Sequence, residues 1–260
     1  MTGQPRNIKH NLIVTTSWDD GTVADLKLAE LLSKYNIRGT FYVARDYGRP
    51  LPQRDMLALD GEFEIGAHTL SHPDLTRLSL AEAKREIEGS RAYLEDQLGH
   101  GVTMFCYPYG KYNQQIKELV RSAGFTAART CHPGGFNLSP DPYQWHITTL
   151  ASNGSPLMAV KTLWRFHLGQ AKALFDWEVR ARLLFDLALG QGGVYHIYGH
   201  AEELAQNDEW DKIERVLDYL ASREGVSYLT NGEVWGQQKK TGGAKCRVPG
   251  NKIQNTMRNG

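Results

Sequence analysis

Residues 64–75 read Glu64-Ile65-Gly66-Ala67-His68-Thr69-Leu70-Ser71-His72-Pro73-Asp74-Leu75, and the interpretation of the whole chain starts from them. An apolar segment leads into two histidines four residues apart, and Pro73 disfavours a regular helix across that point because proline lacks the amide donor. One helical turn would place both imidazoles on one face, where a single divalent ion can bind both. A His-x-x-x-His pair alone is more often a surface or core pair, so the metal-site hypothesis needs a third ligand.

The composition is typical of a soluble globular protein. The chain has 260 residues, 41% of them apolar and 23% charged, which is enough for a buried core. A formal net charge of +1 without a dense basic patch argues against nucleic acid as a partner. Residues 1–11 carry no apolar core of signal-peptide length, and no later run is long enough to span a bilayer. Three cysteines without Cys-x-x-Cys spacing are interpreted as reduced, so we expect a cytoplasmic protein of undetermined oligomeric state.

Short β-branched runs alternate with helical patterns along most of the chain. Predicted strands cover residues 11–17, 39–43, 63–65, 102–107, 125–128, 193–198 and 226–229, and predicted helices lie within 26–35, 79–98, 113–123, 161–190 and 208–221. Ser79 with Glu82 three residues later predicts a capping box, and Gly99 predicts the helix end. Such alternation favours a parallel sheet flanked by helices, and the number of units favours an α/β barrel, closed or partly closed.

A single core accounts for this pattern, so we assign one domain. Residues 1–10 are interpreted as an N-terminal extension, residues 11–235 as the domain, and residues 236–260, which are poor in apolar side chains, as a disordered tail. In parallel barrels, functional side chains gather just beyond the carboxyl ends of the strands. The residues that follow predicted strands in this way are Asp19, Asp20, His68, His72, Pro108, Tyr109 and His200.

Asp19 and Asp20 follow at the C-terminal end of the first predicted strand, just before a glycine. An aspartate pair at this position is often turn chemistry. Together with His68 and His72, however, one carboxylate completes a three-ligand site with open positions for water and substrate, as in catalytic metal sites. The second carboxylate is then free to act as a base toward water whose pKa the metal lowers.

Three motifs together resemble a known family. Residues 16–21 (Thr16-Ser17-Trp18-Asp19-Asp20-Gly21), 64–72 and 107–110 (Tyr107-Pro108-Tyr109-Gly110) are similar, in this order, to the first three motifs of the polysaccharide deacetylases, the NodB homology domain. The Tyr-Pro-Tyr-Gly form of the third motif indicates a variant branch. The resemblance covers about residues 12–229. It implies a distorted (β/α) barrel that removes an N- or O-acetyl group from a sugar with the help of a metal.

The resemblance also implies roles for individual residues. Asp19 corresponds to the general base, whereas Asp20, His68 and His72 correspond to the metal ligands. The metal is usually zinc in that family, and cobalt or iron also suits two imidazoles and one carboxylate. Tyr109 corresponds to the residue whose backbone amide helps to bind the oxyanion of the tetrahedral intermediate.

The candidate general acid is His200, which would deliver a proton to the leaving amine. It ends residues 196–200, a stretch similar to the family's fifth motif. Strand alternation places His196, Tyr198 and His200 on one face. His196 lies deeper in the strand and is interpreted as a hydrogen-bonded core histidine, so the strand-end position favours His200. Glu203 is close enough to contribute, or it only begins the next helix.

Some positions depart from the family pattern or stay open. Cys106 stands where many members carry an arginine that orients the catalytic aspartate, and Arg129 at the end of the next strand is a candidate replacement. No fourth motif, an Asp and Trp segment, is recognised between Ala128 and His200, so no partner is assigned to the histidine. Thr69 corresponds to a family position whose hydroxyl braces the histidine loop, or it is a plain turn residue.

The leading hypothesis is therefore a zinc-dependent hydrolase of linear amide bonds that removes an N-acetyl or related acyl group from an amino sugar or saccharide. One alternative is a cyclic-amide hydrolase of the same fold, similar to allantoinases, but that branch typically lacks the metal triad. Another is a non-catalytic carbohydrate-binding protein, which would have no need for a base such as Asp19 beside a metal. The sequence does not indicate which sugar or acyl group is the substrate.

Overall fold

The computed structural model describes residues 11–240, so the predicted N-terminal extension, residues 1–10, lies outside the described residues. The strands are β1 (Leu12–Asp20), β2 (Gly39–Val43), β3 (Glu64–Ala67), β4 (Met104–Cys106), β5 (Ala127–Pro133), β6 (Trp145–Ile147), β7 (Thr149–Leu150), β8 (Gly193–Gly199) and β9 (Val226–Tyr228). The α-helices are α1 (Asp25–Lys34), α2 (Gln53–Asp60), α3 (Leu80–Leu98), α4 (Gln114–Ser122), α5 (Pro156–Arg165), α6 (Lys172–Phe175), α7 (Trp177–Gln191), α8 (Ala201–Gln206), α9 (Trp210–Leu220) and α10 (Asn231–Lys240). Short 3-10 turns cover Leu75–Arg77, Pro108–Gly110 and Pro142–Gln144.

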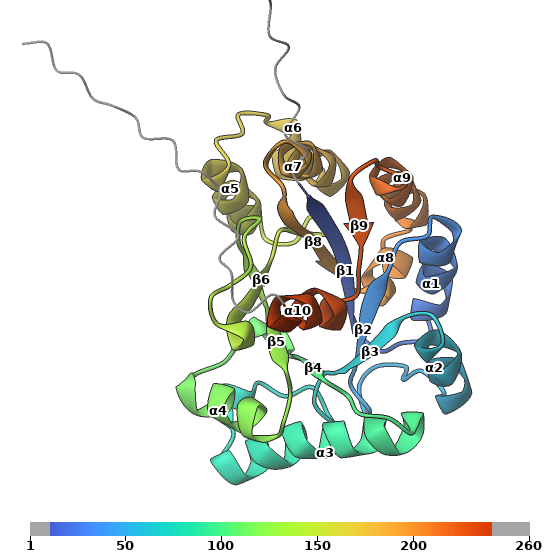
Figure 1. The fold of residues 1–260 in the computed structure, drawn as a ribbon, viewed down its shortest axis with the longest axis vertical. Helices are drawn as coiled ribbons and strands as arrows, with labels where there is room; N and C mark the ends of the chain where they lie inside the picture. Colours follow the sequence, from blue (N-terminus) through green and yellow to red (C-terminus); the bar gives the residue numbers. More distant parts are fainter. Residues whose placement is uncertain (1–10, 241–260) are drawn as a thin grey trace, which may run out of the picture.

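The strands form one parallel sheet that curls into a barrel. Their order is β6-β5-β4-β3-β2-β1-β8-β7, with β9 beside the start of β1. Only Thr148 separates β6 from β7, so one short segment pairs with β5 at one edge and with β8 at the other. The sheet is therefore a nearly closed, distorted barrel with helices around it, which confirms the predicted fold (Figure 1). A continuous apolar core from Leu12 to Leu220 confirms the single domain.

β1 is the central strand of this barrel. Eight of its nine residues are buried, as expected for a parallel strand that is covered on both faces. Alternate side chains point to the same face of a strand, so one row of β1 residues faces the barrel interior. The pairs made by this row are Thr15 with Asn231, Ser17 with His196, and Asp19 with Arg129.

Helix α3 begins and ends where the sequence predicts. The hydroxyl of Ser79 accepts a hydrogen bond from the amide of Glu82, and the Glu82 carboxylate accepts one from the amide of Ser79 at 3.0 Å. This is the predicted capping box, which satisfies two amides at the helix start. Gly99 ends the helix with φ of 76°, a left-handed conformation that glycine adopts at little cost.

Several boundaries differ from the prediction. β1 continues to Asp20, because its pairing with β2 extends to that residue, so the two aspartates are part of the strand rather than of the turn beyond it. Helix α2 lies where the sequence pattern predicts no element. Helix α10 runs to Lys240, so the predicted start of the tail at residue 236 falls inside a helix whose Val234 and Trp235 pack in the barrel core. Residues 241–260 lie outside the described residues.

Within residues 11–240, no helix combines the length and the apolar character that crossing a bilayer requires.

Candidate metal centre and active site

Three predicted ligands converge where β1 and β3 end. The Nε2 atoms of His68 and His72 lie 3.8 Å and 3.6 Å from Oδ1 of Asp20, and all three ligand atoms lie within 4.8 Å of one another. Oδ1 of Asp20 is buried and has no hydrogen-bond partner among residues 11–240. A buried carboxylate oxygen without a donor is costly, and a divalent cation would satisfy it. The donor set therefore fits a three-ligand metal site.

A second group of possible ligands consists of Asp19, His68 and Cys106. It shares His68 with the first group, so the two groups are alternatives. Asp19 already forms an ion pair with Arg129. Burial raises the pKa of the Cys106 thiol well above its ordinary value, which disfavours the thiolate that a metal binds. The group that contains Asp20 is the better metal site.

The histidine pair does not lie on a helical turn, so that prediction was wrong. β3 ends at Ala67, and Thr69 and His72 adopt φ of 67° and 57° in the loop that follows. Pro73 prevents a helix from forming across this point, and the two left-handed residues turn the chain tightly instead. Such conformations cost on the order of 1–3 kcal/mol each and persist where the surroundings enforce them. Both imidazoles reach Asp20 through this loop geometry.

Hydrogen bonds hold the histidine loop from two directions. Oγ1 of Thr69 accepts from the amide of His72 at 3.0 Å, which is the bracing role suggested by the sequence. The carboxylate of Glu86, on α3, accepts from the amides of Leu70 and Ser71 at 2.8 Å and 2.9 Å. Nothing in the sequence indicates Glu86, because its role depends on how α3 packs against the loop.

His68 is prepared to bind a cation. Its Nδ1–H donates to the carbonyl oxygen of Cys106 at 2.9 Å. A carbonyl oxygen only accepts, so the proton is on Nδ1 and the lone pair of Nε2 faces Asp20. Burial lowers the pKa of His68 to about 3 despite the opposing charge of Asp19, and burial also lowers the pKa of His72. Both rings are therefore neutral, which is the metal-binding form.

Asp19 lies inside the barrel against a buried arginine. The guanidinium of Arg129 pairs with its Oδ1, and Sγ of Cys106 lies 3.4 Å from its Oδ2. Burial by itself raises the pKa of Asp19, but the charges of Arg129, His68 and His200 outweigh it and bring the pKa to about 2. Arg129 thus contacts the aspartate from β5, as expected from the cysteine at position 106.

Asp20 has a different environment from its neighbour. It is the last residue of β1 and has φ of 86°, which turns its side chain toward the two histidines. Burial raises its pKa to about 6; the charge of His200 opposes this rise and that of Asp19 adds to it. A cation bound there would reverse the shift, because an opposite charge favours the carboxylate. One aspartate is thus neutralised by an arginine, and the other is free for a metal.

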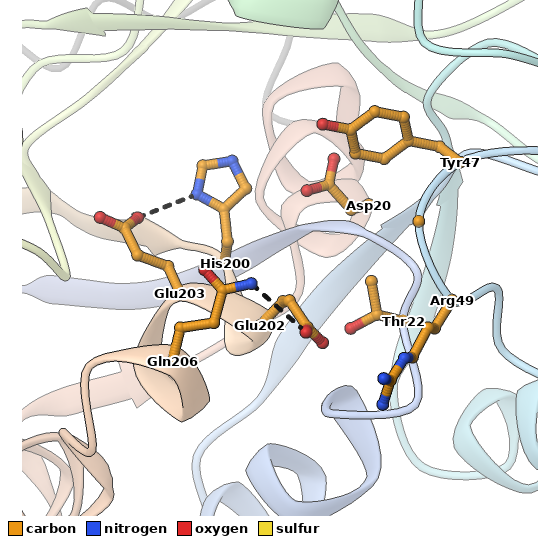
Figure 2. Close-up of a pocket in the computed structure, with 9 residues that line it drawn as sticks. Asp20, Thr22, Tyr47, Arg49, His200, Glu202, Glu203 and Gln206 are labelled. Carbon is orange, nitrogen blue, oxygen red and sulfur yellow. Dashed lines mark hydrogen bonds and ion pairs between the residues drawn. The ribbon is translucent and has the colours of Figure 1, made fainter.

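His200 faces the same site from the end of β8. Its Nδ1 lies 3.4 Å from Oε2 of Glu203, on α8 (Figure 2). Burial opposes the charged imidazole, but the hydrogen bond to Glu203 and the charges of Asp19 and Asp20 raise the pKa of His200 above its ordinary value. Its side chain keeps 28% of its surface exposed. Glu203 is therefore the partner that the sequence left unassigned, and His200 can carry a proton.

His196 and the pair Asp176-Trp177 have structural roles. Nε2 of His196 lies 2.8 Å from Oγ of Ser17 and its ring packs on Trp145, which confirms it as a hydrogen-bonded core histidine. An Asp-Trp pair does occur in the expected interval, as Asp176-Trp177. The aspartate caps the start of α7 and the tryptophan is fully buried. The fourth-motif residue types are present, but they support α7 here.

Two tyrosines flank His72. The Tyr47 ring lies 4.3 Å and the Tyr109 ring 4.7 Å from the imidazole, measured between ring centroids. Tyr109 has φ of 59° in the turn after β4, and its side chain is 57% exposed. A strained, exposed turn beside the metal ligands suits a substrate-contacting position. The role of the Tyr109 amide as an oxyanion donor stays a prediction.

A cleft of about 440 Å³ opens beside Asp20 and His200 (Figure 2). Its volume falls in the range of small-molecule sites, roughly 300–1,000 Å³. The remaining lining residues are Thr22, Tyr47, Gly48, Arg49, Glu202, Glu203 and Gln206. Hydroxyl, amide and charged groups alternate with apolar surface in this lining, so the cleft suits a ligand that combines hydrogen-bonding groups with apolar faces.

Residues 7–128 match the sequence model of the family described as polysaccharide deacetylase. This match covers just under half of the chain, and over that range the chain is similar to the polysaccharide deacetylases. The matched range contains Asp19, Asp20, His68, His72 and Tyr109, whereas His200 lies beyond it. Over 111 residues the chain is 29% identical to peptidoglycan-N-acetylmuramic acid deacetylase PdaC of Bacillus subtilis, which covers 42% of this chain and 24% of that protein. The chain thus spans about a quarter of the length of this curated relative.

Solved structures share the fold of this chain. A protein from Mycobacterium smegmatis assigned to the polysaccharide deacetylases superposes with a TM-score of 0.65 at 13% identity, covering 92% of this chain and 93% of its own. A family 4 acetyl xylan esterase from Clostridium thermocellum superposes with a TM-score of 0.57 at 18% identity, covering 87% and 92%. The esterase structure holds a cobalt ion.

Proposed function

We propose that this protein is a metal-dependent hydrolase that removes an acetyl group from the nitrogen of an amino sugar within a saccharide. The observation that carries the proposal is the arrangement of two oppositely prepared groups, Asp19 and His200, around the Asp20, His68 and His72 set. A divalent cation such as zinc or cobalt, when bound there, would acidify a water molecule and polarise the acetyl carbonyl.

The residues of the chain divide the proton transfers between them. Asp19 is ionised, because its pKa is about 2, and can accept a proton from the attacking water. His200 holds a proton through Glu203 and can donate it to the departing amine nitrogen. The amide of Tyr109 is proposed to donate to the oxyanion that forms between these two steps. Groups with separated pKa values suit this pairing of base and acid.

The substrate class follows from the cleft and the relatives. Its lining combines charged and hydroxyl groups with the exposed ring of Tyr47, which suits a sugar that stacks on an aromatic face and forms several hydrogen bonds. The Bacillus subtilis relative is named for a peptidoglycan sugar. We therefore propose a soluble N-acetylated saccharide as the first substrate to test. The cytoplasmic location stays a prediction.

The two alternatives remain testable. A cyclic-amide hydrolase of the same fold is less consistent with a complete set of Asp20, His68 and His72. A non-catalytic saccharide-binding protein has no use for an ionised Asp19 held by a buried arginine, nor for a protonated histidine opposite it. Retention of both proton-transfer groups favours an enzyme.

The first experiment is elemental analysis of the purified protein beside His72→Ala, followed by acetate release from N-acetylglucosamine oligomers. We expect near-stoichiometric divalent metal in the parent, loss of that metal in the variant, and acetate release by the parent alone. Metal without acetate release from any saccharide, but with opening of allantoin, would favour the cyclic-amide alternative. A parent that stays metal-free after incubation with zinc would reject the metal site.

A further inference from the structure

Helices α5 and α6 lie at the edge of the molecule (Figure 1). Both expose large apolar side chains. On α5, Leu157, Val160 and Trp164 keep 60%, 48% and 80% of their surface exposed, and Phe175 at the end of α6 keeps 75%. Spacings of three and four residues place the three α5 side chains on one face of that helix. The opposite face of α5 is buried against the body of the protein, so the exposed face is a second apolar side.

Cations accompany these apolar groups. Lys161, Arg165 and Lys172 are exposed, and none of them forms an ion pair with another described residue. The sequence from Pro142 to Phe175 contains no aspartate or glutamate. We call these seven side chains, four apolar and three cationic, the α5–α6 surface. Soluble proteins rarely expose apolar side chains together in this way without a partner.

We propose that the α5–α6 surface docks on a lipid bilayer that is rich in anionic headgroups. Tryptophan, phenylalanine and aliphatic side chains on one helix face enter the boundary between headgroups and acyl chains, while lysine and arginine stay at the level of the phosphates. Each cation near an anionic bilayer strengthens binding by roughly fivefold. A helix that lies in the interface needs no span across the membrane.

The positive charge of the α5–α6 surface favours an anionic bilayer over other binding partners. A second copy that pairs through the same face would set three cations against three cations. Residues 241–260 carry four basic residues and no acidic one, so this segment is repelled by the α5–α6 surface as well. A neutral glycan can stack on Trp164 or Phe175, but it makes no use of Leu157 and Val160 or of the cations.

The α5–α6 surface is connected to the rim of the catalytic cleft. The amide of Trp177, two residues beyond the end of α6, donates to Oδ1 of Asn153 at 3.0 Å. In the same segment, the amide of Ala151 donates to the carbonyl of Tyr198 at 2.7 Å, and Tyr198 is two residues before His200. Docking through α5 and α6 would therefore hold the cleft near the bilayer surface.

The test uses the full chain and vesicles of defined composition. Trp164 is by far the most exposed of the tryptophans in residues 11–240, so its fluorescence reports on contact with lipid. We expect co-sedimentation with phosphatidylglycerol vesicles, a shift of the emission to shorter wavelength, and protection from iodide quenching. Binding to phosphatidylcholine vesicles should be about a hundredfold weaker, and salt should weaken the phosphatidylglycerol binding.

Variants locate the contact. Trp164→Ala with Phe175→Ala, and separately Lys161→Glu with Arg165→Glu, should each reduce co-sedimentation at least tenfold while the circular dichroism melting curve stays unchanged. Leu80→Ala, at an apolar α3 residue that is 48% exposed, is the matched control and should bind as the parent does. The proposal is overturned if the parent ignores phosphatidylglycerol vesicles or if both double variants bind normally. It is also overturned if Trp164 instead mediates dimer formation or capture by insoluble chitin.

Discussion

The barrel buries acidic side chains at both of its ends, and the two ends treat them differently. Where β2 and β3 begin, Glu64 accepts hydrogen bonds from Oγ1 of Thr40 at 2.6 Å and from the amide of Gly232 at 2.8 Å. Asn231 joins the same cluster by donating to Oη of Tyr42 and accepting from Thr15. The side chains of this cluster all have partners, and α10, whose first residues are Asn231 and Gly232, lies across the strands at this end (Figure 1).

At the opposite end, where β1 and β3 end, some buried polar atoms lack a hydrogen-bond partner within the described part of the chain. Oδ1 of Asp20 and Nδ1 of His72 are buried without a partner among residues 11–240. Four of the eight non-glycine residues with positive φ in that range belong to this end, namely Asp20, Thr69, His72 and Tyr109. Strained backbone is costly, so the four positive-φ residues gathered around an unsatisfied carboxylate oxygen mark this end as a candidate working site.

Both ends also contain a carboxyl group with a raised pKa. Burial raises the pKa of Glu64 to about 7, although its hydrogen bonds oppose the rise, and burial raises that of Asp20 to about 6. A proton can compensate the desolvation of Glu64, whereas two neutral imidazoles beside Asp20 allow a metal cation to do so. The desolvation of a buried carboxyl group is therefore offset by a proton at Glu64, and it favours cation binding at Asp20.

The largest expected effect comes from removing the proposed base. Asp19→Asn should lower turnover by about 10³-fold, because general base catalysis contributes on the order of 10²–10⁴-fold. Metal content should stay near that of the parent, since Asp19 lies outside the proposed ligand set. Acetate release and elemental analysis measure the two quantities. Glu64→Gln is the control at the other end and should keep its turnover; near-normal turnover of Asp19→Asn would remove Asp19 from the mechanism.

The next largest effect concerns Arg129, which neutralises Asp19 at the end of the barrel that carries the candidate metal site. Arg129→Ala leaves Asp19 buried without its cation, which should cost about 3–5 kcal/mol in the free energy of unfolding. The same change should raise the pKa of Asp19, so the acid limb of the pH–rate profile moves to higher pH. Urea unfolding and the pH profile measure these two effects. Arg129→Lys keeps a charge and should recover part of both; an unmoved acid limb in Arg129→Lys and Arg129→Ala would show that Arg129 is only structural.

At the end of the barrel that contains Glu64, we expect the free energy of unfolding to depend on pH. Between the ordinary pKa of 4.5 and about 7, the folded protein keeps the Glu64 proton that the unfolded chain has lost. Stability should therefore fall as pH rises through this window, by about 3 kcal/mol from this group. Glu64→Gln cannot titrate and should lose this part of the slope. Urea unfolding at several pH values measures this slope in the parent and in the variant. Equal slopes would contradict the raised pKa of Glu64.

The smallest effect concerns the proton on His200. Glu203→Gln removes the partner that raises the His200 pKa, so the basic limb of the pH–rate profile should move to lower pH. Activity near neutral pH should fall by no more than about tenfold, because one unit of pKa corresponds to about 1.4 kcal/mol. The pH dependence of acetate release measures the shift. Glu202→Gln, on the neighbouring position, is the matched control and should leave the basic limb closer to that of the parent.

Features with local causes could be predicted from the sequence. Ser79 and Glu82 form their capping box because the two residues are one helical turn apart, and the alternation of strands and helices was enough to predict the barrel. The segments that carry Asp20, His68 and His72 were predicted to meet because parallel strands end at one edge of a sheet. The conformation of the histidine loop was predicted wrongly, since a spacing of four residues does not distinguish a helical turn from a strained loop.

The sequence by itself thus determined the family resemblance, the barrel class and the residue types of the site, because these depend on short motifs and on periodicity. Only the tertiary structure decided which groups tune them. The sequence offered Arg129 only as a candidate partner of Asp19, and the folded barrel brings the two together across 110 residues. Glu86, which nothing in the sequence indicated, reaches the histidine loop from α3. The placement of α10 over Glu64 also follows from barrel closure. Such contacts arise when many packed elements settle together, and no single stretch of sequence contains that information.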